Sequence, residues 1–517
     1  MTGENIYDSI AETLSKKGIN CAVGTIYDMM AIWKSWYRGS VNDFHYYSQT
    51  LVDGTTCSCE RLTMNMPKKL CEDMQKLTWS EKVQITLDSK AKTKRLWDVL
   101  DSKENSFTVN FPTAIEHAYA LGTKAFVEYK KDDKTLIDYI DGDLVIPYMF
   151  TNTYINGLIT ISRFTEKKGK TTFYYTHLTL HEFNGEDYVK YNELYKSKNE
   201  NDLGKEVDFS EWFPDVENPT VFEDVKTPHF QMLRPMIANN FDTGSPLGIS
   251  VFANHIDKFK AIDLKYDSFA NEYELGKKMV AVDIGAMKNI TTVDVTGNPK
   301  TVMAFDKNNK VWQAINGMEG QPIKEIDFTL RAQEHIDGIN ADLNYLSSGV
   351  GLEGFYEFGK AGLKTATEVV SENSEIFRTK KNHETMIKDV VYDMVQAICQ
   401  LEGIETKSIN IVTDDSIIED ENTLVERGLR LYQANTISLD TFLQKYLHLD
   451  EKQSEEEKIK IMSNMKTVID LLDSSIIDSQ KAIELLFTDI DEKEKARLIA
   501  NLGDVSFEVE GTEETEV

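Results

Sequence analysis

The sequence has few of the residues that build disulfide scaffolds or active sites. Its 517 residues include only five cysteines, an odd number that suits a reducing compartment better than a set of disulfides. The N-terminus shows neither a basic start nor an apolar run, so no signal peptide is expected. No stretch approaches the ~18 apolar residues of a membrane span. Neither a G-x-S-x-G nor an H-E-x-x-H motif occurs. We expect a soluble, non-enzymatic protein that is made in the cytoplasm, without a cofactor and without a membrane partner.

Three of the cysteines are close enough in sequence to be considered as metal ligands. These are Cys57, Cys59 and Cys71. No fourth ligand follows at a zinc-like spacing, and Cys71 falls in a segment with helical periodicity. The sequence therefore predicts no metal site.

Positive charge is also scarce. The chain has 86 acidic and 57 basic residues, and its formal net charge is −29. A protein that grips nucleic acid over a broad face normally carries a basic surface. The ordinary interpretation of the excess acid is solubility. The alternative is a surface along which a polyanion such as DNA slides without sticking.

The N-terminal half changes from helical to strand periodicity. Apolar residues recur at steps of three and four through Ile26, Met30 and Trp33, and again over Arg61–Lys76. From about residue 125 to residue 195, β-branched and aromatic residues predominate. Asn184-Gly185 separates two such runs, which indicates a hairpin. The sequence predicts helices that precede a meandering antiparallel sheet.

Two long helices are expected on either side of a small β module. The first is expected to begin at Ser245-Pro246, because serine can cap a helix and proline suits its first turn. The second spans about Ile323–Leu346. Its apolar positions are spaced four, three, four and three apart, which predicts a helix–helix seam of Ala332, Ile336, Ile339, Leu343 and Leu346. Between the helices, Val302–Phe305 and Lys310–Trp312 are expected to form a hairpin.

A glycine-rich segment follows the second long helix. Gly349–Gly354 matches the G-x-G-x-x-G string of dinucleotide-binding folds, but that motif requires a preceding strand, and here a helix precedes it. Gly359–Thr365 lacks the spacing of a phosphate-binding loop. We interpret the segment as a mobile turn. Beyond it, residues 363–401 are expected to be helical, 414–501 to form short helices, and 504–517 to be a disordered acidic tail.

Several stretches resemble, in order, the portal proteins of tailed phages that infect Gram-positive bacteria. The longest is Asn239–Asn254. The others are Ile32-Trp33, Trp36–Gly39, Arg61–Lys68, Cys71-Glu72, Ala120–Thr123, Ile262-Asp263, Tyr266–Phe269, Asn271-Glu272, Leu275–Lys278, Asp414–Glu426, Gly428-Leu429 and Thr436–Ser438. The resemblance covers most of residues 25–460. Met279 departs from it, since a basic residue is expected there, and the C-terminal tail has no counterpart.

The resemblance implies an α+β, portal-type architecture assembled as a ring, usually of twelve subunits. It implies a wing over 1–244, a stem helix over 245–279, a clip over 280–322, a second stem helix over 323–347, a tunnel loop over 348–362, a wing helix with a helical crown over 363–503, and the acidic tail over 504–517. Such a ring lies in the virion, at one vertex of the capsid.

The resemblance also implies partners and a channel. The partners are further copies of the chain, the packaging ATPase (terminase), major capsid and scaffolding proteins, a head-completion adaptor, and double-stranded DNA that passes without sequence specificity. Acidic side chains of the second stem helix would repel phosphate, and the loop would lie near the DNA. The residues expected at the channel are Glu334, Asp337, Asp342, Gly354, Phe355, Tyr356, Lys360 and Lys364.

Two alternatives remain open on the residues alone. Another virion component, such as a minor capsid protein or a tail connector, would also be acidic and oligomeric, although the two helices that bracket a β module argue against it. A nucleotide-dependent enzyme is the alternative from another class, and a nucleotide-binding assay would distinguish it.

Overall fold

The computed structural model describes most of the first 460 residues. The described residues are 6–50, 54–79, 83–151, 154–275, 279–283, 288–293, 299–304, 313–315, 323–326, 329–358, 374–413, 421–434, 436–447, 449 and 453–460. The chain divides into two compact units, Met1–Ile418 and Glu419–Val517. Helices and sheets both contribute, as the predicted α+β class requires. Of the helices in these ranges, none combines the length and the apolar character needed to cross a membrane. Lys360, Lys364 and the tail 504–517 lie outside the described residues.

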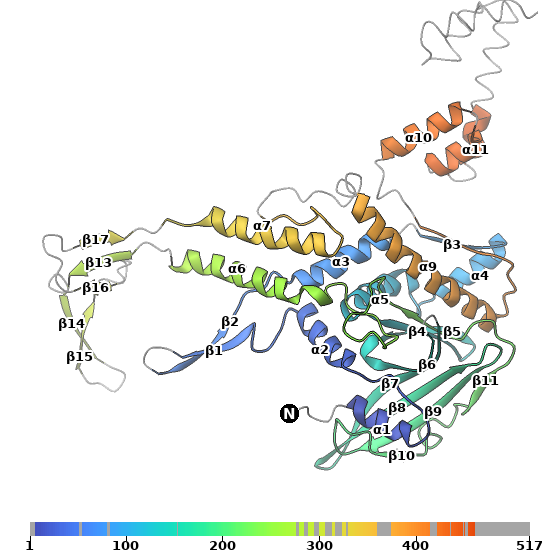
Figure 1. Cartoon of the computed structure of the whole chain (residues 1–517), viewed down its shortest axis with the longest axis horizontal. Helices are drawn as coiled ribbons and strands as arrows, with labels where there is room; N and C mark the ends of the chain where they lie inside the picture. The colour runs from blue at the N-terminus through green and yellow to red at the C-terminus, as the bar shows by residue number, and fades with distance from the viewer. Residues whose placement is uncertain are drawn as a thin grey trace, which may run out of the picture. The chain divides into compact units, whose positions relative to one another are not determined.

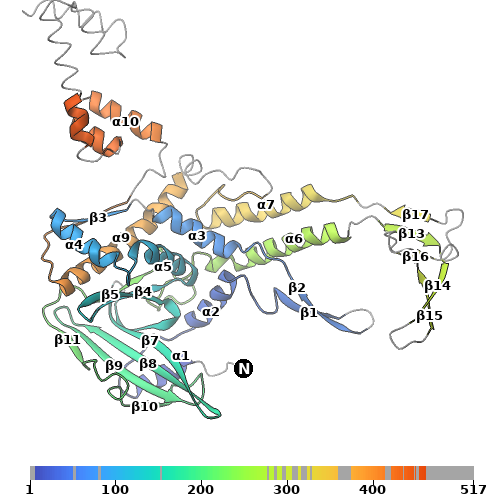
Figure 2. The ribbon, with the colours of Figure 1, turned by 180° about the vertical axis from the view of Figure 1, so that it is seen from behind.

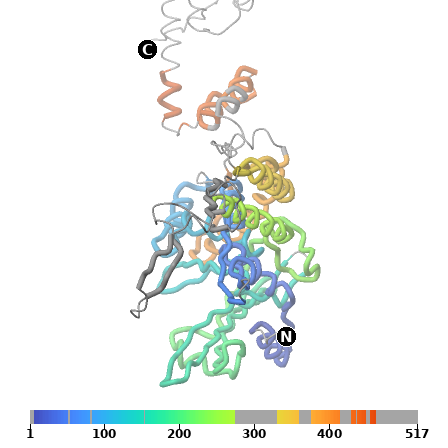
Figure 3. The backbone as a smooth tube through the Cα atoms, turned by 90° about the vertical axis from the view of Figure 1, so that its left-hand side faces the viewer, coloured from blue at the N-terminus to red at the C-terminus, as the bar shows by residue number. Residues whose placement is uncertain are grey.

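The first unit begins with helices that confirm the predicted apolar stripes. These helices are α1 (Ile6–Ser15), α2 (Ile26–Tyr37) and α3 (Met66–Thr78). Ile26, Met30 and Trp33 of α2 are fully buried. The helix α1 lies beside the strands of the largest sheet (Figure 3), where the Tyr7 hydroxyl donates to the carbonyl of Asp143 over 2.7 Å.

Three further helices complete the body of this unit. They are α4 (Lys90–Leu100), α5 (Phe107–Leu121) and α9 (Ser374–Glu402). The helix α3 packs against both α5 and α9 (Figure 2). The strand β3 (Gln84–Leu87), which precedes α4, pairs antiparallel with the strand β18 (Ile409–Val412), which follows α9.

The predicted antiparallel meander is confirmed. A six-stranded sheet runs in the order β10-β9-β8-β7-β6, with β11 beside β9, and a three-stranded sheet runs in the order β12-β4-β5. The bounds are β4 Lys124–Lys131, β5 Lys134–Asp141, β6 Val145–Phe150, β7 Ile155–Lys168, β8 Thr171–Phe183, β9 Tyr188–Ser197, β10 Lys205–Val207, β11 Thr220–Phe222 and β12 Phe230–Leu233. Phe183 pairs with Tyr188 across the Asn184-Gly185 turn, and Gly185 has the positive φ of 103° that favours glycine there.

The first long helix begins later than predicted. A 3₁₀ turn, η2 (Ala253–His255), leads into α6 (Ile256–Leu275). The residues before it are bound to the end of α5: Gly248 donates its N–H to Thr123 Oγ1, and Val251 donates to the carbonyl of Tyr119, each over 3.0 Å. A side chain at Gly122, where φ is +82°, would lie 2.5 Å from the Ile249 backbone. This close packing holds Ser245–Phe252 in a non-helical conformation, so the predicted start at Ser245 is wrong.

The second long helix is also shorter than predicted. The helix α7 spans Ala332–Gly349, whereas Ile323–Ile326 forms the strand β17. This strand pairs antiparallel with β13 (Met279–Asp283), so its backbone groups are used by a sheet. The predicted seam is confirmed at Ile339, Leu343 and Leu346, which are buried at 2% exposure or less. Its first two residues, Ala332 and Ile336, are only partly buried.

The described strands of the β module between the long helices form two small sheets. The strand β15 (Pro299–Ala304) pairs with β14 (Lys288–Val293). The strand β16 (Gln313–Ile315) lies parallel to β13, in a sheet ordered β16-β13-β17. Val302 of the predicted hairpin between Val302–Phe305 and Lys310–Trp312 faces Ile290 of β14. Phe305 and Lys310–Trp312 lie outside the described residues, so the hairpin itself stays a prediction.

The second unit contains short helices, as predicted for this region. Its elements include α10 (Glu421–Gln433), α11 (Leu439–Thr441) and the π-helical turn η4 (Phe442–Tyr446), and residues 453–460 are also helical. Phe442, Leu443 and Tyr446 form a small buried cluster. Ser438 caps the start of α11, since its Oγ accepts a hydrogen bond of 3.2 Å from the N–H of Thr441.

Candidate functional site

The candidate site is the antiparallel pair of helices α6 and α7, which lie side by side (Figure 1). Two ionic contacts fix their register. Near the middle, Lys265 Nζ lies 2.5 Å from Asp342 Oδ2 and donates to the carbonyl of Gly338 over 3.0 Å. At the C-terminal end of α6, the Arg331 guanidinium binds both carboxylate oxygens of Glu272, over 3.0 Å and 2.8 Å. Apolar packing and these pairs together hold the two helices as a unit.

The contact between Glu272 and Arg331 is bidentate, the geometry in which arginine binds carboxylates most strongly. The hydrogen bonds from Arg331 lower the pKa of Glu272 to about 2, so this carboxylate is ionised at every physiological pH. Because Arg331 directly precedes α7, the pair fixes the start of α7 against the last turn of α6.

The solvent-facing side of α7 is acidic. Glu334 and Asp337 are exposed and lie three residues apart, on one face of the helix. The helix contains no lysine or arginine. Asp342, which we predicted to face a channel with them, is different: its carboxylate is 18% exposed and is paired with Lys265 of α6. Its charge is therefore neutralised within the subunit. Of the predicted acidic residues, Glu334 and Asp337 remain exposed, and Asp337 Oδ1 accepts a hydrogen bond of 2.8 Å from the Gln333 side-chain amide.

The segment after α7 turns back along the helix pair. Gly351 and Gly354 have φ of +73° and +74°, which lets the chain reverse. The Asn340 side chain then binds the backbone of Phe358 twice: its amide donates to the Phe358 carbonyl over 3.1 Å, and its oxygen accepts from the Phe358 N–H over 2.6 Å. The Phe358 ring meets Tyr266 of α6 edge to face, with ring centroids 6.2 Å apart. Residues 350–358 are thus attached to the two helices.

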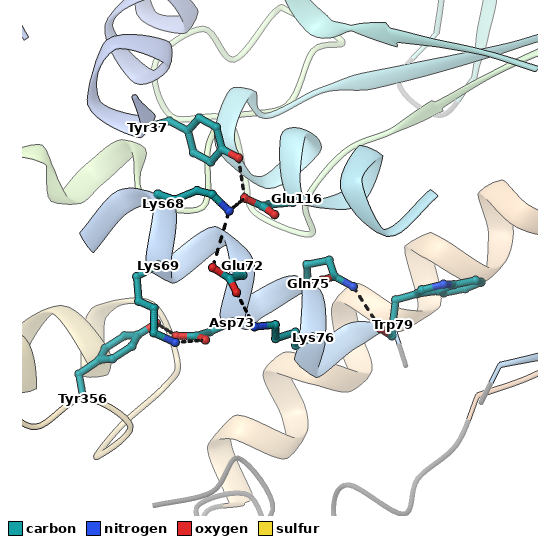
Figure 4. A network of polar contacts seen from close by, with 10 residues as sticks. All are labelled: Tyr37, Lys68, Lys69, Glu72, Asp73, Gln75, Lys76, Trp79, Glu116 and Tyr356. Carbon is teal, nitrogen blue, oxygen red and sulfur yellow. Dashed lines mark hydrogen bonds and ion pairs between the residues drawn. The ribbon is translucent and has the colours of Figure 1, made fainter. Parts of the chain in front are cut away.

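The same segment is also attached to the body. Tyr356 is 4% exposed, and its hydroxyl donates to Asp73 Oδ2 of α3 over 3.0 Å (Figure 4). The other oxygen of Asp73 binds Lys69. Burial, with the nearby Asp73 charge, raises the pKa of Tyr356 well above its usual value. A buried tyrosine cannot contact DNA, so we remove Tyr356 from the predicted channel residues. Phe355 is partly buried and Gly354 is exposed.

Asp73 belongs to a larger polar network along α3 (Figure 4). Glu116 of α5 accepts hydrogen bonds of 2.5 Å from the Tyr37 hydroxyl and from Lys68 Nζ. Glu72 pairs with Lys76, whose hydrogen bond lowers the Glu72 pKa. Helices α2, α3 and α5 and the segment that follows α7 are therefore connected through polar groups as well as through the apolar core.

A second buried carboxylate joins α6 to the N-terminal region. Asp263 is 2% exposed and accepts three hydrogen bonds, from His45 Nε2 over 3.0 Å, from Thr63 Oγ1 over 2.9 Å and from the Met64 N–H over 2.9 Å. Sequence reasoning did not assign a role to this residue. The sequence does place Asp263 next to the apolar Ile262, on the side of α6 that is expected to be buried. A buried carboxylate requires hydrogen-bond partners, and this could have pointed to its role.

The arrangement positions charged side chains along the two helices. Within the described ranges, no group of three or more His, Cys, Asp or Glu side chains could hold a metal ion. The G-x-G-x-x-G string begins at Gly349, the last residue of α7, as the sequence analysis expected. A side chain at Gly349 would lie 2.4 Å from the ring of His255, so this glycine permits the close approach of α7 to the base of α6.

Comparisons with known proteins agree with this arrangement. The search against curated proteins returns no match. Residues 25–468 match the protein family described as "Phage portal protein, SPP1 Gp6-like". This match includes α2 to α7, α9 and α10, and so it covers both long helices and the β module between them. The chain therefore belongs to the SPP1 Gp6-like family of phage portal proteins.

Proposed function

We propose that this chain is one subunit of a ring of twelve copies that forms the channel at one vertex of a phage capsid. DNA enters and leaves the capsid through this channel, and the head and tail join there. The observation that carries the proposal is the helix pair α6 and α7, which brackets a β module and presents an acidic face without lysine or arginine on α7. The family to which the chain belongs supports the same role.

The acidic face of α7 suits a surface past which DNA moves. DNA carries one negative charge per ~1.7 Å of its axis, and basic side chains would bind it tightly and stop it. The helix α7 contains no lysine or arginine. Its exposed residues Glu334 and Asp337 repel phosphate over a distance of ~8 Å at physiological salt. A ring in which these residues face the channel would let DNA slide with little friction.

We propose a division of the chain that follows the bounds of its elements. The proposed stem helices are Ile256–Leu275 and Ala332–Gly349, and the proposed clip consists of the strands from Met279 to Ile326. We assign 1–244 with α9 to the wing and the helices from Glu421 to the crown. The clip would dock the terminase and later the head-completion adaptor, while the outer surface would meet the major capsid and scaffolding proteins. The subunit itself performs no bond chemistry.

Charge reversal on α7 tests the proposed channel. Glu334→Lys combined with Asp337→Lys changes the charge of each chain by four and places two cations on the exposed face. Assembled wild-type rings should bind double-stranded DNA weakly. Rings of the variant should bind it clearly more tightly, with an affinity that falls steeply as salt is raised.

A matched control variant distinguishes the effect of where the lysines are placed from the effect of the changed net charge. Asp8 and Glu12 are exposed on α1 and are four residues apart, so Asp8→Lys with Glu12→Lys changes the net charge equally. Rings of this control should bind linear DNA little better than the wild type does. If the control and the α7 variant bind DNA equally, the tighter binding reflects net charge only, and the channel position of Glu334 and Asp337 is wrong.

A further inference from the structure

A two-stranded hairpin lies apart from the sheets of the body. It pairs β1 (Tyr46–Thr50) with β2 (Thr56–Glu60) in antiparallel register. Cys57 and Cys59 are both on β2 and two residues apart, so their side chains point to the same face of the strand. Both are partly exposed, and their Sγ atoms lie 3.8 Å apart. Two accessible thiols are thus held side by side by a paired strand.

This separation matches the spacing that one metal ion imposes on two thiolates. A zinc–thiolate bond is about 2.3 Å long, and tetrahedral coordination places two such sulfur atoms about 3.8 Å apart. Cadmium has longer bonds but the same preference for soft sulfur ligands. The two sulfur atoms could therefore bind one such ion with little change in the hairpin backbone.

Oxygen atoms of the paired strand lie next to both thiols. Gln49 faces Cys57 in the register, its carbonyl oxygen lies 3.5 Å from Cys57 Sγ, and its side-chain Oε1 lies 3.8 Å from Cys59 Sγ. The remaining cysteines are separate from this pair: Cys71 and Cys399 are buried in α3 and α9, and Cys21 precedes α2. The hairpin is therefore the part of the chain where two thiols can act together.

We propose that Cys57 and Cys59 form a binding site for one soft divalent cation of the zinc and cadmium class, with water completing the coordination. On binding, the metal displaces one proton from each Sγ, and both protons pass to solvent. The site is independent of the portal role. Because the chain would form a ring through head-to-tail contacts, the same hairpin of two neighbours would not meet, so each chain should bind its own ion.

Metal and protons compete for the same sulfur atoms. The affinity for the cation should therefore increase as the pH rises.

Titration with Cd²⁺ tests the site directly. The full-length chain, kept reduced with a phosphine, is titrated while the near-ultraviolet absorption of the thiolate–cadmium bond is recorded. We expect saturation at one ion per chain. Removing a residue that only hydrogen-bonds to a metal ligand already costs about 10–100-fold in metal affinity. Removing a ligand itself, by Cys57→Ser or by Cys59→Ser, should therefore weaken Cd²⁺ binding at least that much. Cys21→Ser should bind as the wild type does.

One variant keeps the number of thiols and changes only their geometry. Ser58 is exposed on β2, so Ser58→Cys with Cys59→Ser places the second thiol on the opposite face of the strand. This variant should no longer saturate with one Cd²⁺ ion per chain, while its circular dichroism and melting temperature stay those of the wild type. Saturation at one ion per two chains, equal binding by the geometric variant, or no thiolate–cadmium absorption in the wild type would each overturn the proposal.

Discussion

The hydroxyl of Tyr356 donates a hydrogen bond of 3.0 Å to the Asp73 carboxylate, and the two residues are 283 positions apart in the chain. This contact ties the segment that follows α7 to α3 in the body. Together with the two hydrogen bonds between Asn340 and Phe358, it determines where the chain leaves the helix pair before residue 359. The first part of the predicted tunnel loop is thus anchored at both sides.

Removal of the Tyr356 hydroxyl should loosen this anchor. Tyr356→Phe keeps the ring but leaves a buried oxygen of Asp73 without that donor, at a cost of about 1–3 kcal/mol in unfolding free energy. Hydrogen exchange of residues 350–358 should become faster. Tyr345→Phe is the matched control, because Tyr345 is 61% exposed. Equal exchange in the two variants would show that the Asp73 contact does not hold the segment.

A charge in the seam between α6 and α7 should destabilise the helix pair. Ile339 is fully buried, so Ile339→Asp places a carboxylate in an apolar contact and should cost several kcal/mol. Ala341→Asp changes an exposed position of the same helix and should leave the melting temperature within about 1 °C. Equal melting temperatures for the two variants would contradict the assigned seam.

The buried Asp263 should be required for the junction between α6 and the N-terminal region. Asp263→Ala leaves the His45 ring, the Thr63 hydroxyl and the Met64 N–H without their acceptor, and each such loss costs about 1–3 kcal/mol. Urea unfolding should show a clear loss of stability. Asp257→Ala, whose carboxylate is 71% exposed, should show little loss. A similar midpoint for both variants would mean that Asp263 contributes no more than a surface carboxylate.

Glu128 should make stability depend on pH. Complete burial in β4 raises the pKa of Glu128 to about 8, compared with 4.5 for a free side chain. The folded chain therefore keeps a proton that the unfolded chain releases, and its contribution to stability is full below pH 4.5 and is lost as the pH rises to about 8. Glu128→Gln cannot ionise, so it should raise the melting temperature more at about pH 8 than at about pH 5.

The control for this prediction is Glu12→Gln. The Glu12 carboxylate is 74% exposed, so its replacement should shift the melting temperature by a similar small amount at both pH values. If Glu128→Gln also shifts the melting temperature equally at both, Glu128 is ionised in the folded chain and its raised pKa is wrong.

Local periodicity predicted the parts of the fold that depend on local sequence. The apolar stripe of α2, the hairpin at Asn184-Gly185 and the seam at Ile339 and Leu343 all follow from side-chain spacing within one element, and the structure confirms them. The start of α6 was missed because a serine–proline capping signal is local, whereas the segment after it is held by Tyr119 of the distant helix α5 and by Thr123, which follows that helix. Likewise, Ile323–Ile326 continues a helical spacing but pairs with β13.

The site was predictable only in its charge pattern. The acidic character of α7 is visible in the sequence, and Glu334 and Asp337 are exposed as expected. The pairing of Asp342 with Lys265 and of Tyr356 with Asp73 joins elements far apart in the chain, and no spacing rule gives such partners. These two contacts change the set of proposed channel residues, because each withdraws a side chain from solvent.

Electron microscopy of the purified chain would reveal directly whether the subunits form a ring. Portal subunits should assemble into closed rings with a central hole, since head-to-tail interfaces close into rings when the rotation allows. With a net charge of −29 per chain, assembly should improve as salt screens the repulsion between subunits. We predict ring-shaped particles of uniform subunit number at moderate salt. A chain that stays monomeric at every salt and protein concentration would contradict the account.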